Sequence, residues 1–124
     1  PKSLISEAFQ TNGLAGITAA ANEYNARPQA EKSSKYVNDI AIDAATGAIT
    51  VTLESDANAG LPADASNGTL VFTPNVQGAL VAAGAVGAID WACASATSTT
   101  ATARGLTVAA NGTLLAKYAP GECR

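Results

Sequence analysis

The sequence has no histidine and no methionine, and it contains two cysteines and one tryptophan in 124 residues. Without histidine, neither a serine–histidine nor a cysteine–histidine nucleophile pair can form. A zinc site would have to rely on the two thiols and on carboxylates. We therefore expect no enzyme activity, no metal and no cofactor.

Charged residues are also scarce, at 14% of the chain, and the net charge is −3. Strong nucleic-acid binding needs clustered lysine and arginine, so none is expected from this domain. The acidic residues are scattered, and Asp90 is the one acid we examine further, because it is expected within a strand, on the solvent side. Asn67 and Asn111 each begin an Asn-Gly-Thr glycosylation pattern, which we interpret as a turn. No apolar run reaches the length of a membrane-spanning helix.

The length suits a single domain over residues 1–124 with one core. Its first residues, Pro1-Lys-Ser-Leu-Ile5, resemble the interior of a helix. We therefore expect the chain to be a mature or truncated part of a longer protein.

Cys93 and Cys123 could form a redox pair, contribute to a metal site or form a disulfide. A redox dithiol usually has the Cys-x-x-Cys spacing, whereas these residues are 30 positions apart. A disulfide is the interpretation we favour, and it places the folded domain in an oxidising compartment outside the cytoplasm. Closing this loop would stabilise the domain by roughly 3–4 kcal/mol.

Residues 1–26 are predicted to form one helix, because apolar residues recur at steps of three and four. Asn12, Gly13 and Gly16 weaken it, each glycine by about 1 kcal/mol relative to alanine. The helix is expected to end before Pro28, and the polar residues 27–35 are expected to form a loop. The apolar stripe consists of Leu4, Ile5, Ala8, Phe9, Gly16, Ile17, Ala20 and Tyr24.

The period then changes to two, which predicts an antiparallel sheet of four strands within residues 36–93. The strands are expected at 36–42, 48–54, 69–73 and 87–93, with Pro74 ending the third. A helix packed on one face of such a sheet is an α+β fold. The residues expected to form the sheet core, together with Tyr36, are Ile40, Ile42, Ile49, Val51, Leu53, Ile89 and Trp91.

The segment after Cys93 is rich in small polar residues, so residues 94–103 are expected to form an exposed loop. Asn111-Gly112 lies between two apolar runs, which predicts a small hairpin over residues 105–118. The sequence Pro120-Gly121 is expected to turn the chain so that Cys123 reaches Cys93.

The order of these elements resembles the globular domain of a bacterial type IV pilin of the type IVa class. The most specific similarities are the strand Ile89-Asp-Trp-Ala-Cys93 and the tail Lys117-Tyr-Ala-Pro-Gly-Glu-Cys-Arg124. The resemblance covers essentially the whole chain. It implies a pilin fold in which residues 1–26 are the second half of a longer helix. The hydrophobic first half, which anchors such proteins in the membrane, is absent from the sequence.

The resemblance also implies a function: the major structural subunit of a type IV pilus, with a minor pilin or a secretion-system pseudopilin as the alternative. Implied partners are copies of the chain itself, the pilus assembly machinery, and host-cell or abiotic surfaces. Implied roles are twitching motility, adhesion, biofilm formation and DNA uptake.

The resemblance implies that the protein is located in an extracellular pilus and that subunits reside in the inner membrane before assembly. It also implies methylation as a modification. The helix stripe would pack subunits together. The loop between the cysteines would be a surface recognition region, with the candidate residues Ser95, Thr97, Arg104, Asn111 and Lys117.

Overall fold

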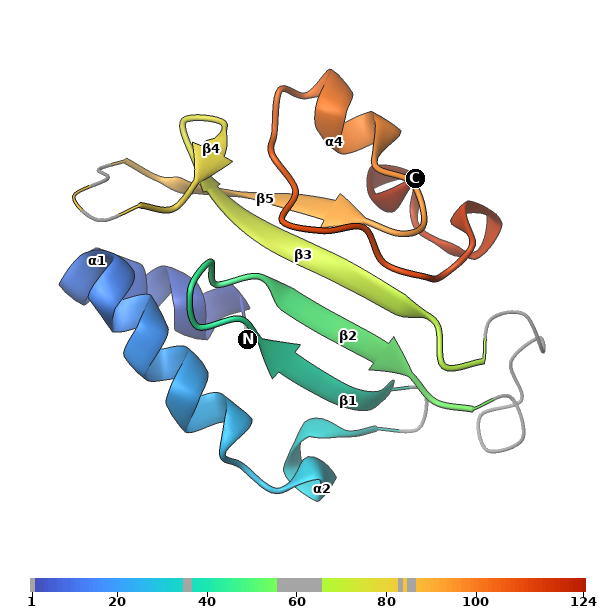
Figure 1. Cartoon of the computed structure of the whole chain (residues 1–124), viewed down its shortest axis with the longest axis horizontal. Helices are drawn as coiled ribbons and strands as arrows, with labels where there is room; N and C mark the ends of the chain where they lie inside the picture. Colours follow the sequence, from blue (N-terminus) through green and yellow to red (C-terminus); the bar gives the residue numbers. More distant parts are fainter. Residues whose placement is uncertain (1, 35–36, 56–65, 83, 85–86) are drawn as a thin grey trace.

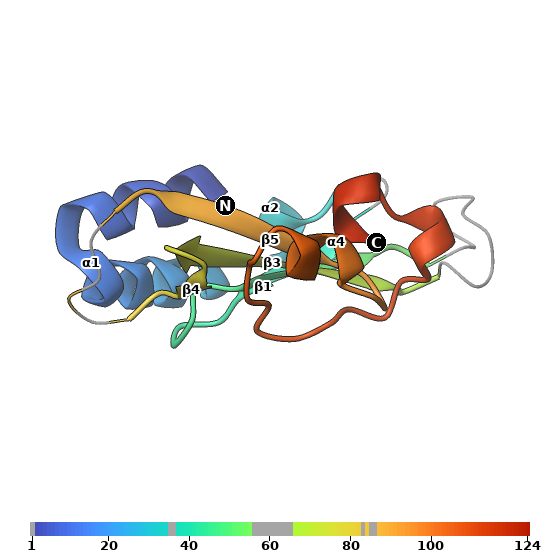
Figure 2. The same cartoon turned by 90° about the horizontal axis from the view of Figure 1, so that it is seen from above.

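Helix α1 (Lys2–Asn25) begins the fold and bends sharply at Gly13, where the backbone has φ 63° and ψ −145°. The computed structural model describes all residues except 1, 35–36, 56–65, 83 and 85–86. Residues 2–12, the first arm, and residues 14–25, the second arm, fold back against each other (Figures 1 and 2). The predicted uninterrupted helix is therefore wrong at Gly13, because only glycine adopts this conformation readily.

In the part of the chain that the structure describes, five strands form an antiparallel sheet with β3 at its centre. Strand β3 pairs with β2 and β4 along one edge and with β5 along the other, and β1 pairs with β2. The short strand β4 was not predicted. The bounds are β1 (Val37–Ile42), β2 (Ile49–Leu53), β3 (Thr69–Val76), β4 (Ala79–Leu80) and β5 (Ile89–Ala94).

Pro74 does not end β3, contrary to the prediction, and the strand continues to Val76. A proline cannot donate to a ladder, so a strand tolerates it where one edge lacks a partner. The pairing with β2 ends at Phe72 and the pairing with β4 begins at Asn75, while β5 pairs along the opposite edge from Val71 to Val76. Pro74 therefore lies in the gap between two partners.

The first core cluster lies between α1 and the sheet. Ile5 from the first arm and Ile17 from the second are fully buried there. Both side chains approach Gly47 in the β1–β2 turn: a Cβ at Gly47 would lie 3.0 Å from Ile17, 3.1 Å from Pro74 and 3.6 Å from Ile5. Gly47 also has φ 76°, so both the conformation and the crowding require glycine.

Hydrogen bonds attach the second arm to β1 and to the turn that follows it. Asn25 donates from Nδ2 to the Ile42 carbonyl at 2.6 Å and accepts from the Ile42 N–H at 2.9 Å. Thr18 donates from its hydroxyl to the Ala44 carbonyl at 2.8 Å. The side chain of Asn25 thus satisfies both polar groups of an edge-strand residue.

Two short helices replace predicted irregular segments. Helix α2 (Gln29–Lys32) lies within the predicted loop 27–35, and α4 (Thr99–Ala103) lies within the predicted exposed loop 94–103. Ala101 is buried, so a segment of small residues still contributes to packing.

Tyr36, expected in the first strand, and residues 56–65, between the second and third expected strands, lie outside the described residues. Among those described, no helix combines the length and the apolarity needed to cross a membrane.

Replacing Asn25 by alanine is expected to lower the free energy of unfolding by about 1–3 kcal/mol, because both backbone groups of Ile42 lose their partner. Urea denaturation measures this change. Asn22→Ala, an exposed position in the same arm, is the matched control and is expected to change stability little. Equal losses in the two variants would contradict the role given to Asn25.

Candidate functional site: the disulfide-bounded region

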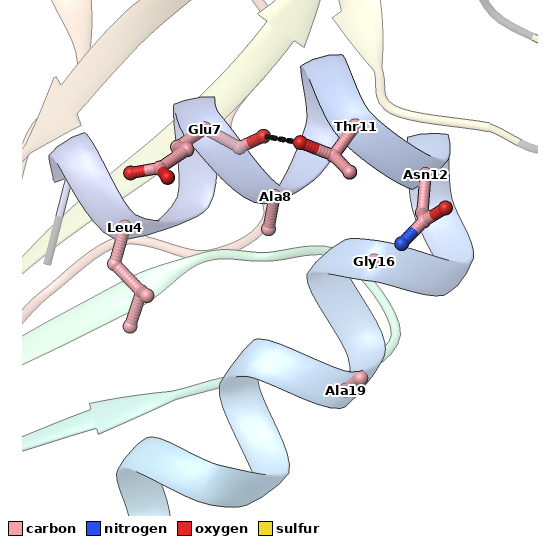
Figure 3. A pocket seen from close by; sticks show the side chains of 7 residues that line it. All are labelled: Leu4, Glu7, Ala8, Thr11, Asn12, Gly16 and Ala19. Atoms are coloured by element: carbon pink, nitrogen blue, oxygen red, sulfur yellow. Dashed lines mark hydrogen bonds between the residues drawn. The ribbon is translucent and has the colours of Figure 1, made fainter.

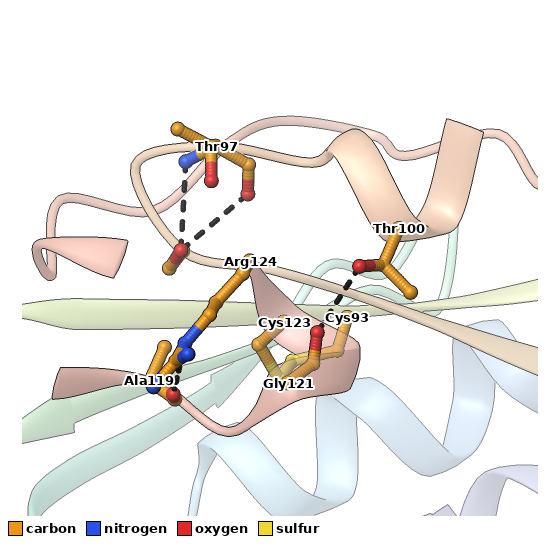
Figure 4. Close-up of a disulfide and its surroundings, with 8 residues drawn as sticks. Cys93, Thr97, Thr100, Ala119, Gly121, Cys123 and Arg124 are labelled. Atoms are coloured by element: carbon orange, nitrogen blue, oxygen red, sulfur yellow. Dashed lines mark hydrogen bonds between the residues drawn. A yellow bond between two sulfur atoms is a disulfide. The ribbon is translucent and has the colours of Figure 1, made fainter. Parts of the chain in front are cut away.

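Cys93 and Cys123 form a disulfide, as the sequence predicted, with their Cα atoms 4.6 Å apart (Figure 4). Cys93 is at the end of β5, and Cys123 is in the 3₁₀ helix η3 (Gly121–Cys123). Both are buried and form a second core cluster with Leu114 and Ala119. Partly buried side chains from β2, β3 and the 3₁₀ helix η2 (Ala116–Tyr118) pack against it: Leu53, Leu70, Phe72 and Tyr118.

Thr69 and Thr113 hold the middle of the region to the start of β3. Each backbone N–H donates to the hydroxyl of the other residue, at 3.0 and 2.9 Å. The N–H groups of Thr113 and Leu114 also donate to the Thr69 carbonyl, both at 3.1 Å. A Cβ at Gly112 would overlap that same carbonyl oxygen, so the close approach depends on glycine.

Asn75 holds the segment of residues 105–111, which we call the strap, on the face of the sheet opposite α1. Its Nδ2 donates to the Thr107 carbonyl and its Oδ1 accepts from the Thr107 N–H, both at 2.9 Å. Thr73 adds a third bond, because its hydroxyl accepts from the Ala109 N–H at 3.1 Å. Thr73 and Asn75 are fully buried, and Figures 1 and 2 show the strap and the first arm on opposite sides of the sheet.

The predicted hairpin across Asn111-Gly112 is therefore wrong. Residues 105–118, all described, contain no strand. The Gly112 N–H donates to the Ser95 carbonyl at 2.7 Å and the Ala96 N–H donates to the Leu114 carbonyl at 2.8 Å. This part of the chain pairs with the segment after β5 and with β3, and not with itself.

The end of the chain packs against α4. Thr100 donates from its N–H to the Arg124 backbone oxygen at 3.0 Å and from its hydroxyl to the Gly121 carbonyl at 3.1 Å. Arg124 Nε donates to the Ala119 carbonyl at 3.0 Å (Figure 4). Helix α4 is thereby joined to the segment that carries the disulfide.

Four of the five candidate recognition residues are exposed: Thr97, Arg104, Asn111 and Lys117. Arg104 pairs with Asp90 at 3.0 Å, and Asp90 is exposed as expected. Ser95 is fully buried, so its predicted place on the surface is wrong. The reason is its backbone, which donates to the Cys123 carbonyl and accepts from Gly112 and is therefore enclosed between them.

The helix stripe and the predicted sheet core meet in the first cluster. Five stripe residues are buried, namely Ile5, Phe9, Gly16, Ile17 and Tyr24, while Leu4, Ala8 and Ala20 are partly buried. Ile42 and Ile49 are buried, and Ile40, Val51, Ile89 and Trp91 pack against the cluster from the sheet. Leu53 packs instead against the disulfide cluster.

Tyr24 is a buried titratable residue in the first core cluster. Burial raises the pKa of its phenol, an effect that nearby Arg27 opposes and Asp39 reinforces. The guanidinium of Arg27 lies 5.2 Å from the Tyr24 ring and the Lys32 ammonium 5.9 Å from it. These contacts hold the end of α1 and α2 together.

The sequence interpretation missed Thr73 and Asn75, which position the strap. The sequence does contain a pattern that involves them: these two polar residues alternate with Phe72, Pro74 and Val76 and therefore share one face of a strand. A polar face is normally read as solvated, so the pattern alone could not reveal a buried partner. In the described ranges, no group of three acidic or cysteine side chains comes together that could hold a metal.

The comparisons with known proteins agree with this architecture. The family model of pilins, which form bacterial filaments, matches residues 1–124. A crystal structure of a type IV pilin from Pseudomonas aeruginosa strain Pa110594 has a TM-score of 0.80 and 38% sequence identity. That match covers 99% of this chain and 87% of the other. A search of curated protein sequences found no match.

The α-helix, the antiparallel sheet and the C-terminal disulfide thus define a structural subunit of the type IV pilin class, which confirms the predicted fold. The chain belongs to the pilin family. Membership of this family implies self-assembly into a pilus on the cell surface.

Replacing Asn75 by alanine is expected to lower the free energy of unfolding by about 1–3 kcal/mol, because the two hydrogen bonds between the buried Asn75 side chain and the Thr107 backbone are lost. Thermal or urea unfolding measures the change. Asn111→Ala, at an exposed position in the same strap, serves as the control and is expected to have a small effect. A tolerated Asn75→Ala variant would show that the strap is held by other contacts.

Replacing both cysteines by alanine is expected to lower the free energy of unfolding by roughly 3–4 kcal/mol, because the unfolded chain gains the entropy of an open loop. Urea denaturation of the oxidised protein and of the double variant gives the difference. A reductant should destabilise the wild type and leave the double variant unchanged. Equal stability of the two oxidised proteins would contradict the role of the disulfide.

Proposed function

We propose that this pilin is the major subunit of a type IV pilus that supports twitching motility, surface adhesion and biofilm formation. The observation that carries the proposal is the position of the disulfide-bounded region. Its exposed side chains sit on a backbone that the disulfide, Thr69 and Asn75 hold to the sheet. A filament surface needs every subunit to present the same side chains in the same positions.

The exposed residues of this region form the contact surface in our proposal, namely Thr97, Arg104, Asn111 and Lys117. Binding residues commonly lie on loops that a rigid scaffold positions. With few charges on the chain, this surface would contact host cells or abiotic surfaces chiefly through hydrogen bonds and backbone groups. DNA uptake would then depend on the filament and its retraction more than on binding by this domain.

The helix stripe has two roles in this proposal. Its buried members, such as Ile5 and Ile17, hold the helix to its own sheet. Leu4 and Ala8 remain partly exposed and would contact neighbouring subunits. Subunits would wait in the inner membrane until the assembly machinery adds them to the filament, as the family resemblance implies.

Deleting the gene is expected to remove surface pili and twitching, and the wild-type gene on a plasmid is expected to restore both. In filaments sheared from the wild-type strain, mass spectrometry should find this chain as the most abundant protein. A trace amount in the filaments would instead identify a minor pilin. Abundant filaments in the deletion strain would contradict a role as the main subunit.

A further inference from the structure

The bend at Gly13 is a conformational constraint and not a matter of space. A Cβ added there would meet no atom within 4 Å. The backbone angles, φ 63° and ψ −145°, are ones that side-chain-bearing residues strongly avoid. Both arms are regular helices on either side of this one residue, so a change at Gly13 alone would align them.

The two arms meet where the residues are small. A Cβ at Gly16 in the second arm would overlap the carbonyl oxygen of Ala8 in the first. Figure 3 shows this crossing beside a shallow cleft of about 280 Å³ between the arms. The folded-back form therefore requires glycine at two positions, whereas a straight helix would favour alanine at both.

The arms are attached to the sheet in different ways. Among the described residues, the hydrogen bonds from α1 to the sheet and its turns come from the second arm. The first arm contributes the buried side chains of Ile5 and Phe9, and the Lys2 ammonium lies 4.5 Å from the Phe72 ring and 5.8 Å from the Trp91 ring. Apolar contacts of this kind can be released together without leaving unpaired polar groups.

We propose that Gly13 is a hinge about which the first arm detaches, and that the surface it leaves on β3 and β5 binds the first arm of a second copy of this chain. The surface already fits residues 2–12, because they occupy it in the folded-back form. Exchange between copies would reproduce the same contacts and straighten α1. The inference rests on the proposed function, since a filament holds copies at high effective concentration.

Tryptophan fluorescence can test the hinge directly, because Trp91 is the single tryptophan and the first arm borders it. The variants are Gly13→Ala and Gly16→Ala, each of which disfavours the folded-back form and favours a straight helix. Gly121→Ala is the matched control, since a Cβ there meets nothing within 4 Å and the position carries no positive φ.

At low concentration, both variants are expected to show red-shifted emission and stronger acrylamide quenching than the wild type. The open fraction should rise about tenfold or more, given the cost of the Gly13 conformation for alanine. As concentration rises, light scattering should show a dimer and the emission should return towards that of the wild type, because a partner's arm covers Trp91 again. The control should behave as the wild type does.

Wild-type emission and a monomer at every concentration would overturn the hinge. A persistent red shift without dimers would overturn the second copy as the occupant. Circular dichroism identifies a variant that fails to fold. In that case Phe9→Ala, which keeps both glycines, tests the hinge by the red shift alone, because it weakens docking of the arm on its own sheet and on a second copy equally. These measurements use the 124-residue chain in solution, so the absence of pili in cells would contradict the proposed function and not the hinge.

Discussion

The burial of β3 on both faces is the constraint on which most of this structure depends. On one face, Phe72 and Val76 pack towards α1 and the first core cluster. On the other face, Thr73 and Asn75 are fully buried beneath the strap, and their hydrogen bonds to it replace those they would make with water. A buried polar face is stable when its groups are satisfied, so the strap and β3 depend on each other.

This arrangement explains how a loop region with little regular structure can serve as a fixed surface. The disulfide closes the region at its ends, and Thr69 and Asn75 hold it between them. Exposed residues between these points can change without loosening the backbone that carries them. In a pilin, whose subunits repeat along a filament, such a surface is presented identically by every copy.

Much of the fold follows from local patterns in the sequence. The alternation of Ile49, Val51 and Leu53 places β2 correctly because one face of that strand is apolar. The periodicity of α1 likewise identifies a helix. It does not reveal that the helix axis changes direction at Gly13. The prediction that Pro74 ends β3 is wrong because a proline is tolerated there. At this position the pairing with β2 has ended and the pairing with β4 has not begun, which the local sequence does not show.

The region between the cysteines was harder to predict because its partners are distant in sequence. Asn111-Gly112 has the composition of a hairpin turn, yet Gly112 is there because it approaches Thr69, 43 positions earlier. Asn75 and Thr107 are 32 positions apart, and neither has a local pattern that identifies the other. Local propensity therefore indicated a turn, and long-range hydrogen bonds determined the structure.

Native-state hydrogen exchange tests most directly whether β3 holds this region as a fixed part of the domain. The account predicts that the amides of Thr107 and Ala109, which donate to Asn75 and Thr73, exchange about as slowly as those of β3 and β5. Exchange of both amides at the rate of an exposed, unstructured loop would contradict it.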